Sequence, residues 1–205
     1  MTNGHYYRRR ELMMTNLPKG CGAVSDGADT NAKNKPMQIL TNDTRTLIVY
    51  FSRSGNTEAQ ATFAQETLTA DMVELVVESP YPANYRASVE RATAEREPEE
   101  WPAIITKNLP DFSKYDNILL GHPIWAMTIA NPMRQFLETV GDQLAGKTVT
   151  SFSTNAGYGN GDTQMVLQAL LPKSAKILPG YTIHDTKLES TRDQFKNWLL
   201  RLPID

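Results

Sequence analysis

The stretch that decides the fold is TLIVYFSRSGNT, residues 46–57. Its first half, residues 46–51, is largely apolar, β-branched or aromatic, as in a strand that is buried on both faces of a parallel sheet. Its second half, residues 52–57, is polar, with three hydroxyls, Arg53, one Asn and Gly55. Apolar residues then recur at helical spacing, so a helix is expected to begin near Thr57.

A polar loop between a strand and a helix is typical of a phosphate-binding site. The first N–H groups of a helix have no intrahelical acceptor and lie at the positive end of the helix dipole. Ser52, Ser54 and Thr57 add hydroxyl donors, and Gly55 allows a positive φ or a close approach to a ligand. The loop therefore indicates a bound phosphate group. The alternative is a helix capped by Ser54 or Asn56 for stability alone, because such caps contribute about 1 kcal/mol and need no ligand.

The kind of phosphate is narrowed by two motifs that this loop lacks. It has no G-x-x-x-x-G-K-[ST] pattern, so no lysine is placed in it to hold a triphosphate. It has no G-x-G-x-x-G pattern either, which argues against a dinucleotide pyrophosphate. Hydroxyls and amides without a lysine suit a compact terminal monophosphate.

Four segments of the chain resemble, in order, segments of flavodoxins. The loop SRSGNT, residues 52–57, resembles the [ST]-x-[ST]-G-x-T loop that holds the phosphate of FMN in that family. The resemblance continues through YDNILLGHPIW at 115–125, NPMRQFLE at 131–138 and FSTNAGYG at 152–159. It covers about residues 45–202, which is most of the chain.

Strands and helices alternate along the chain, and this alternation predicts a parallel sheet with right-handed crossovers. Strands are expected at residues 46–51, 72–77, 117–121, 148–153 and 175–183, the last with a break near residues 179–180. The resemblance implies an α/β, flavodoxin-like, doubly wound five-stranded parallel sheet in the order 2-1-3-4-5. In this order the loops after strands 1, 3 and 4 are neighbours at the carboxyl edge, where ligands of such sheets bind.

By resemblance, these loops hold FMN as cofactor. The loop at 52–57 would hold the phosphate, and the loops at 122–130 and 154–161 would border the two sides of the ring. Trp125, a large aromatic residue in a loop at the sheet edge, favours ligand contact. The cofactor-binding residues expected are Ser52, Arg53, Ser54, Gly55, Asn56, Thr57, Pro123, Ile124, Trp125, Ala126, Met127, Thr154, Asn155, Ala156, Gly157, Tyr158, Gly159 and Asp162.

The loops contain no acid–base pair, no nucleophile with its base and no metal cluster, so neither catalytic nor metal-binding residues are expected. His122 is expected to be a hydrogen-bonded structural residue. The chemistry would belong to the cofactor, as in an electron carrier that serves redox partner proteins, a reductase and an acceptor. The alternative is an FMN-dependent NAD(P)H:quinone or flavin oxidoreductase that acts on a small quinone. A third possibility is an interaction module that has lost its cofactor.

Composition sets the remaining limits. The chain has 205 residues, of which 40% are hydrophobic and 21% charged, which suits one globular domain. Its net charge of −2 does not suggest a nucleic-acid partner. No apolar run is long enough for a membrane span, and the arginines at 8–10 precede no apolar signal core. A cytoplasmic location is therefore expected, and Cys21, the single cysteine, excludes an intramolecular disulfide.

The first part of the chain differs from the rest. Residues 1–43 are rich in polar residues without a sustained period, so they are expected to form a disordered or loosely attached leader. The flavodoxin-like FMN-binding domain is expected to cover residues 44–205.

Overall fold

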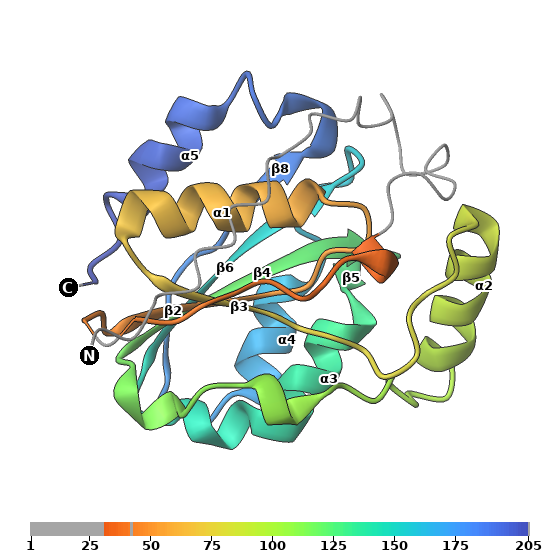
Figure 1. The fold of residues 1–205 in the computed structure, drawn as a ribbon, viewed down its shortest axis with the longest axis horizontal. Helices are drawn as coiled ribbons and strands as arrows, with labels where there is room; N and C mark the ends of the chain where they lie inside the picture. Colours follow the sequence, from red (N-terminus) through yellow and green to blue (C-terminus); the bar gives the residue numbers. More distant parts are fainter. Residues whose placement is uncertain (1–30, 42, 205) are drawn as a thin grey trace, which may run out of the picture.

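A mostly parallel sheet forms the centre of the molecule, with helices on both of its faces (Figure 1). The computed structural model describes residues 31–41 and 43–204. The strands are β1 (Gln38–Ile39), β2 (Thr46–Tyr50), β3 (Asp71–Glu74), β4 (Asn117–Trp125), β5 (Thr128–Ile129), β6 (Thr148–Asn155), β7 (Lys176–Ile177) and β8 (Tyr181–His184). The α-helices are α1 (Asn56–Leu68), α2 (Tyr85–Arg96), α3 (Asn131–Val140), α4 (Thr163–Leu170) and α5 (Arg192–Leu199). Short 3₁₀ turns are η1 (Asn31–Lys33), η2 (Thr106–Asn108), η3 (Phe112–Lys114), η4 (Gly141–Leu144) and η5 (Asp185–Lys187).

The strand order confirms the predicted fold class. The main path of the sheet is β1-β3-β2-β4-β6-β7, and within it β3, β2, β4 and β6 run parallel. The fifth predicted strand is present as β7 and β8, which both pair with β6 and are separated around residues 178–180. The predicted strands 1 to 5 correspond to β2, β3, β4, β6 and the pair β7 and β8, so the core is the expected α/β flavodoxin-like sheet in the order 2-1-3-4-5. The short antiparallel strands β1 and β5 are added to this core.

Alternate side chains of the central strands enter two separate cores. Ile48 and Tyr50 of β2 pack on the side of α1 and α5, which lie above the sheet in Figure 1. Leu47 and Val49 pack on the opposite side, with α3 and α4. All five residues of β2 are buried, as predicted for a strand covered on both faces. This double burial fixes the position of the loop that follows β2.

Residues 31–41, which the sequence pattern places in the leader, are packed against the domain. Gln38 and Ile39 of β1 pair with the edge strand β3. Thr41 donates its backbone N–H and its hydroxyl to Asp71 Oδ1 over 2.7 and 2.8 Å. The sheet therefore begins before residue 44. The sequence does not reveal this, because a strand of two residues is too short to show a pattern. Residues 1–30 lie outside the described residues, and for them the leader stays a prediction.

Across residues 31–41 and 43–204, no helix is both long and apolar enough to cross a membrane.

Candidate functional site

The three loops singled out in the sequence meet at the carboxyl edge of the sheet. β2 pairs with β4, and β4 pairs with β6, so the loops leave three neighbouring strands. The hydroxyls of Thr57 and Thr154 lie 2.8 Å apart and join the first loop to the third. The N–H of Asp162 donates to the carbonyl of Met127 over 3.0 Å and joins the third loop to the second. The structure thus brings the three predicted segments into one site.

The first loop ends in a helix whose opening turn is not capped by a side chain. Gly55 precedes α1 in the left-handed region, with φ of 101°, and its N–H donates to Ser52 Oγ over 3.0 Å. Because α1 has no side-chain cap hydrogen bond, stability capping by Ser54 or Asn56 is not observed. In the described part of the chain, no acceptor meets the N–H groups of Ser54, Asn56 and Thr57. Such a turn is suited to bind an anion.

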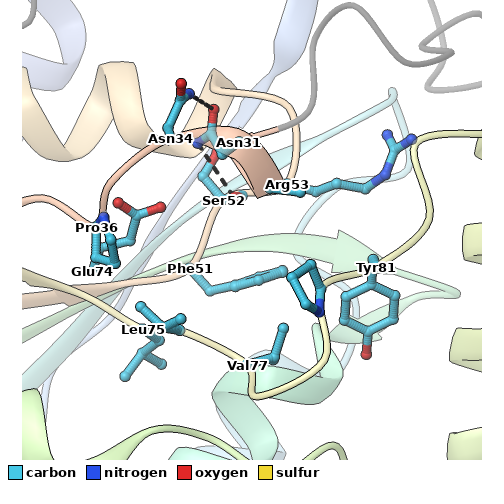
Figure 2. Close-up of a pocket in the computed structure, with 13 residues that line it drawn as sticks. Asn31, Asn34, Pro36, Phe51, Ser52, Arg53, Glu74, Leu75, Val77 and Tyr81 are labelled. Atoms are coloured by element: carbon cyan, nitrogen blue, oxygen red, sulfur yellow. Dashed lines mark hydrogen bonds between the residues drawn. The ribbon is translucent and has the colours of Figure 1, made fainter.

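The side chain of Arg53 is held by the segment before and at the start of α2. Its Nε donates to Ser88 Oγ over 3.2 Å, and its Nη2 donates to the carbonyl of Ala83 over 2.9 Å. The guanidinium lies 5.9 Å from the centre of the Tyr85 ring. Figure 2 shows this side chain extended away from Ser52. The backbone of Arg53 is therefore better placed than its guanidinium to contact a phosphate in the loop.

The second segment is a β-hairpin, and this corrects the expected loop at 122–130. β4 continues past the expected end at residue 121 to Trp125, which pairs with Thr128 of β5. The two turn residues, Ala126 and Met127, both have positive φ, 49° and 65°. These angles indicate a type I′ turn, which usually needs Asn-Gly or similar residues. Ala-Met lacks that signature, and Pro123 argues against a strand, so the sequence gives no sign of the hairpin.

Relief of the strain in this turn is expected to stabilise the protein. A non-glycine residue in the left-handed region costs about 1–2 kcal/mol. The double substitution Ala126→Asn with Met127→Gly should therefore raise the free energy of unfolding by about 1–2 kcal/mol, measured by urea denaturation without flavin. A decrease would contradict the type I′ assignment.

Trp125 belongs to an aromatic cluster with Phe51 and Tyr81. Its ring meets Phe51 edge to face, with centroids 5.5 Å apart, and meets Tyr81 in the same manner at 5.0 Å. Each such pair contributes about 0.5–1.5 kcal/mol beyond the buried area. Trp125 thus ties the hairpin to the end of β2 and to the segment after β3. This packing role accompanies any contact that its half-buried ring makes with a ligand.

The third loop is shaped by glycines and one amide. Asn155 donates from Nδ2 to Thr182 Oγ1 and to the carbonyl of Ile183, and its Oδ1 accepts the N–H of Gly157 over 2.7 Å. Gly157, Gly159 and Gly161 all have positive φ. Tyr158, at the centre of the loop, is 70% exposed, and Met127 in the neighbouring hairpin is 51% exposed. Two large apolar side chains are therefore accessible where a planar ring would lie.

Two buried acceptor atoms in these loops have no partner among the described residues. They are Oδ1 of Asn56 and Oδ1 of Asp162. A buried polar atom without a hydrogen bond is costly, which makes such atoms candidates for ligand contacts. FMN offers matching groups, because its ribityl hydroxyls and ring N–H donate while its phosphate accepts from backbone N–H groups. The donors and acceptors of the three loops therefore fit FMN.

His122 is buried at the end of the sheet, as expected for a structural residue. Its exposed fraction is 0%, Nδ1 lies 3.2 Å from the Pro123 carbonyl, and Nε2 has no hydrogen-bond partner among the described residues. Burial lowers the pKa of His122 to about 4, and the Pro123 carbonyl opposes this only in part. The imidazole is therefore neutral at physiological pH.

The low pKa of His122 predicts a loss of stability in acid. In the unfolded chain the pKa is about 6.5, so between pH 6.5 and 4 the unfolded state binds the extra proton. The free energy of unfolding should fall by about 1.4 kcal/mol per pH unit in this range, or about 2 kcal/mol at pH 5. Urea denaturation at pH 7.5 and 5 should show this loss in the native chain and in His184→Asn. It should be reduced in His122→Leu, and an equal loss there would contradict the assignment.

The sequence motif of triphosphate-binding loops, G-x-x-x-x-G-K-[ST], occurs elsewhere in the chain, as GDQLAGKT at residues 141–148. In the structure this segment follows α3 and leads into strand β6 rather than into a helix. Lys147 Nζ donates to the carbonyl of Tyr115 over 2.7 Å. Without a following helix N-terminus, the segment lacks the geometry of such a loop, and it lies at the amino end of β6, away from the three loops.

The fold and the site together define a class: a doubly wound α/β protein in which an uncapped helix start, a hairpin and a glycine-rich loop meet at the switch point of the sheet. The chain belongs to the flavodoxin family, because the family model described as Flavodoxin matches residues 45–202.

Solved structures of flavoproteins share this fold. A putative flavoprotein from Bacteroides uniformis is 27% identical, with a TM-score of 0.66, over 77% of this chain and 98% of that one. A putative flavoprotein from Bacteroides eggerthii is 24% identical, with a TM-score of 0.64, over 80% of this chain and 100% of that one. A flavoprotein from Lactobacillus acidophilus in complex with FMN is 24% identical, with a TM-score of 0.59, over 74% of this chain and 97% of that one. No match was found among curated proteins.

Proposed function

We propose that the chain binds FMN at the three loops and transfers electrons through it. The observation that carries this proposal is the opening turn of α1. Ser54, Asn56 and Thr57 present backbone N–H groups without an acceptor among the described residues, next to two loops with accessible apolar side chains. When bound, FMN supplies one- and two-electron redox chemistry.

Each loop has a separate task in this proposal. The turn of α1 holds the phosphate by N–H groups and by the hydroxyls of Ser54 and Thr57. The hairpin at Ala126 and Met127 and the glycine-rich loop at 156–162 would border the ring and limit the access of water to it. Family membership supports this assignment, as does the FMN complex of the Lactobacillus acidophilus flavoprotein, whose likeness to this chain lies in the fold.

Electron transfer between proteins is favoured over an enzyme of the same fold. The loop at 52–57 suits a compact monophosphate, and it lacks the G-x-G-x-x-G pattern that would bind the pyrophosphate of NAD(P)H. His122, the titratable group beside the second loop, is fully buried and neutral, so it is not suited to donate a proton to a substrate. The partners would be redox proteins, a reductase and an acceptor, in the cytoplasm. The second candidate is the NAD(P)H:quinone or flavin oxidoreductase with a small quinone as acceptor.

Steady-state kinetics distinguish the two functions. The FMN-loaded protein should not oxidise NADH or NADPH in the presence of a quinone when no reductase is added. After reduction by dithionite it should pass electrons to a one-electron protein acceptor such as cytochrome c. Sustained NAD(P)H oxidation without a reductase would instead establish the oxidoreductase.

The charge of the loops predicts the redox potential. Among the site loops and the hairpin, Asp162 is the single carboxylate. In acidic flavodoxins, repulsion of about 1 kcal/mol or more per nearby charge disfavours the anionic reduced flavin. The hydroquinone couple of this protein should therefore be less negative than theirs, and Asp162→Asn should raise it further. Potentiometry that finds it as low as in those carriers would contradict this expectation.

A further inference from the structure

The 3₁₀ turn η1 lies directly on the phosphate-binding loop. The backbone N–H of Asn31 donates to the carbonyl of Arg53 over 2.6 Å. Its side-chain Nδ2 lies 3.4 Å from the carbonyl of Ser52 and donates to Glu58 Oε2 over 2.6 Å. Figure 2 shows Asn31 next to Ser52, with the contact between them dashed. One residue, 21 positions before the loop, thus touches two loop carbonyls and the first turn of α1.

These contacts fix the direction of two consecutive peptide groups. In a planar trans peptide, the C=O of one residue and the N–H of the next point in opposite directions. The carbonyls of Ser52 and Arg53 both point toward Asn31. The N–H groups of Arg53 and Ser54 are therefore turned to the other side of the loop. Successive N–H groups with a common direction form an anion-binding concavity, whereas an inward carbonyl would repel the anion.

Asn31 also contacts a carboxylate in the first turn of α1. Glu58 lies in the first turn of α1, is 8% exposed and would compete with a phosphate for the positive end of the helix. The bond from Asn31 Nδ2 holds one oxygen of this carboxylate toward η1. This bond therefore opposes a turn of the carboxylate toward the phosphate, where its charge would repel the anion.

We propose that Asn31 is a positioning residue of the FMN phosphate site, which orients the N–H groups of the loop and restrains Glu58. This inference rests on the proposed function. It makes the segment before β1 part of the site, although nothing in the pattern of that segment resembles a flavodoxin motif. Asn31 should act only on the phosphate group, so it should raise the affinity for FMN and leave the affinity for riboflavin nearly unchanged.

The test compares two flavins in two variants of the full chain. Asn31→Ala removes the side-chain contacts, and Gln38→Ala is a matched control, since it removes a bond from the same segment to the carbonyl of Asn108. Quenching of flavin fluorescence gives the dissociation constants. Asn31→Ala should weaken FMN about tenfold or more and riboflavin by less than about twofold. Gln38→Ala should change neither by more than about twofold. Equal losses for both flavins, or an unchanged FMN affinity, would overturn the inference.

A second readout uses inorganic phosphate and the flavin-free protein. Phosphate should shift the backbone amide resonances of Arg53 and Ser54 in the native chain, and by less in Asn31→Ala at the same concentration. If the native chain binds phosphate but no flavin, and the variant loses phosphate binding, the proposed function fails while the positioning role stands. If the native chain binds FMN and Asn31→Ala binds it equally well, only the positioning role fails. If the native chain binds neither flavin nor phosphate, both fail.

Discussion

Replacement of Ser54 and Thr57 by alanine is expected to reduce the affinity for FMN by at least about 100-fold. A hydrogen bond to a charged group contributes about 1.5–3 kcal/mol, so two such bonds correspond to a factor of about 100 or more. Thr57 is suited to this role because its hydroxyl can accept from Thr154 at 2.8 Å and still donate to the phosphate. The fold should persist, since α1 does not depend on these side chains for a cap.

The double variant is measured by fluorescence titration with FMN, and circular dichroism checks the fold. Thr67→Ala is a matched control, because this threonine lies on the same helix and its hydroxyl donates to the carbonyl of Phe63, one turn earlier in that helix. The control should bind FMN as the native chain does. Undiminished affinity in the double variant would remove the phosphate site from the first loop.

Gly161→Ala is expected to lower the free energy of unfolding by about 3 kcal/mol. A Cβ at Gly161 would lie 2.0 Å from the carbonyl oxygen of Met127 and 2.5 Å from its carbon, and both are backbone atoms of the hairpin. Backbone yields less readily than a flexible side chain, and overpacking of this kind costs about 1–3 kcal/mol. The positive φ of 53° at Gly161 adds strain. The third loop and the hairpin would be forced apart, so FMN affinity should fall as well.

Gly159→Ala separates the clash from the backbone strain. Gly159 also has a positive φ, 76°, but a Cβ there would meet no atom within 4 Å. Urea denaturation should show a loss of about 1–2 kcal/mol for Gly159→Ala, clearly smaller than for Gly161→Ala. Equal losses would mean that the contact between the two loops does not stabilise the site.

The central sheet and its order could be predicted because they depend on local patterns. β2 is a run of apolar or β-branched residues, and β6 contains Val149, Phe152 and three threonines. Each of the two strands is followed by a polar loop and a helix. Alternation of this kind leaves few topologies, and the motifs at residues 52–57 and 152–159 select one of them. The convergence of the loops then follows from the strand order, without knowledge of any side-chain contact.

The rest of the site depends on contacts that no local pattern encodes. The turn at Ala126 and Met127 has positive φ without Gly or Asn, and the carbonyl of Met127 accepts the N–H of Asp162 in the third loop. The guanidinium of Arg53 lies toward α2, although the sequence places this residue in the phosphate loop. Asn31 reaches the same loop from a polar segment with no period. Each of these positions is decided by residues distant in sequence.

The most direct test of the account is a titration of the purified protein with FMN and with riboflavin. One FMN should bind per chain, with quenched fluorescence, and riboflavin should bind about 100-fold more weakly because it lacks the phosphate. A protein that binds no FMN, or that binds both flavins equally well, would contradict the claim that the opening turn of α1 holds a phosphate.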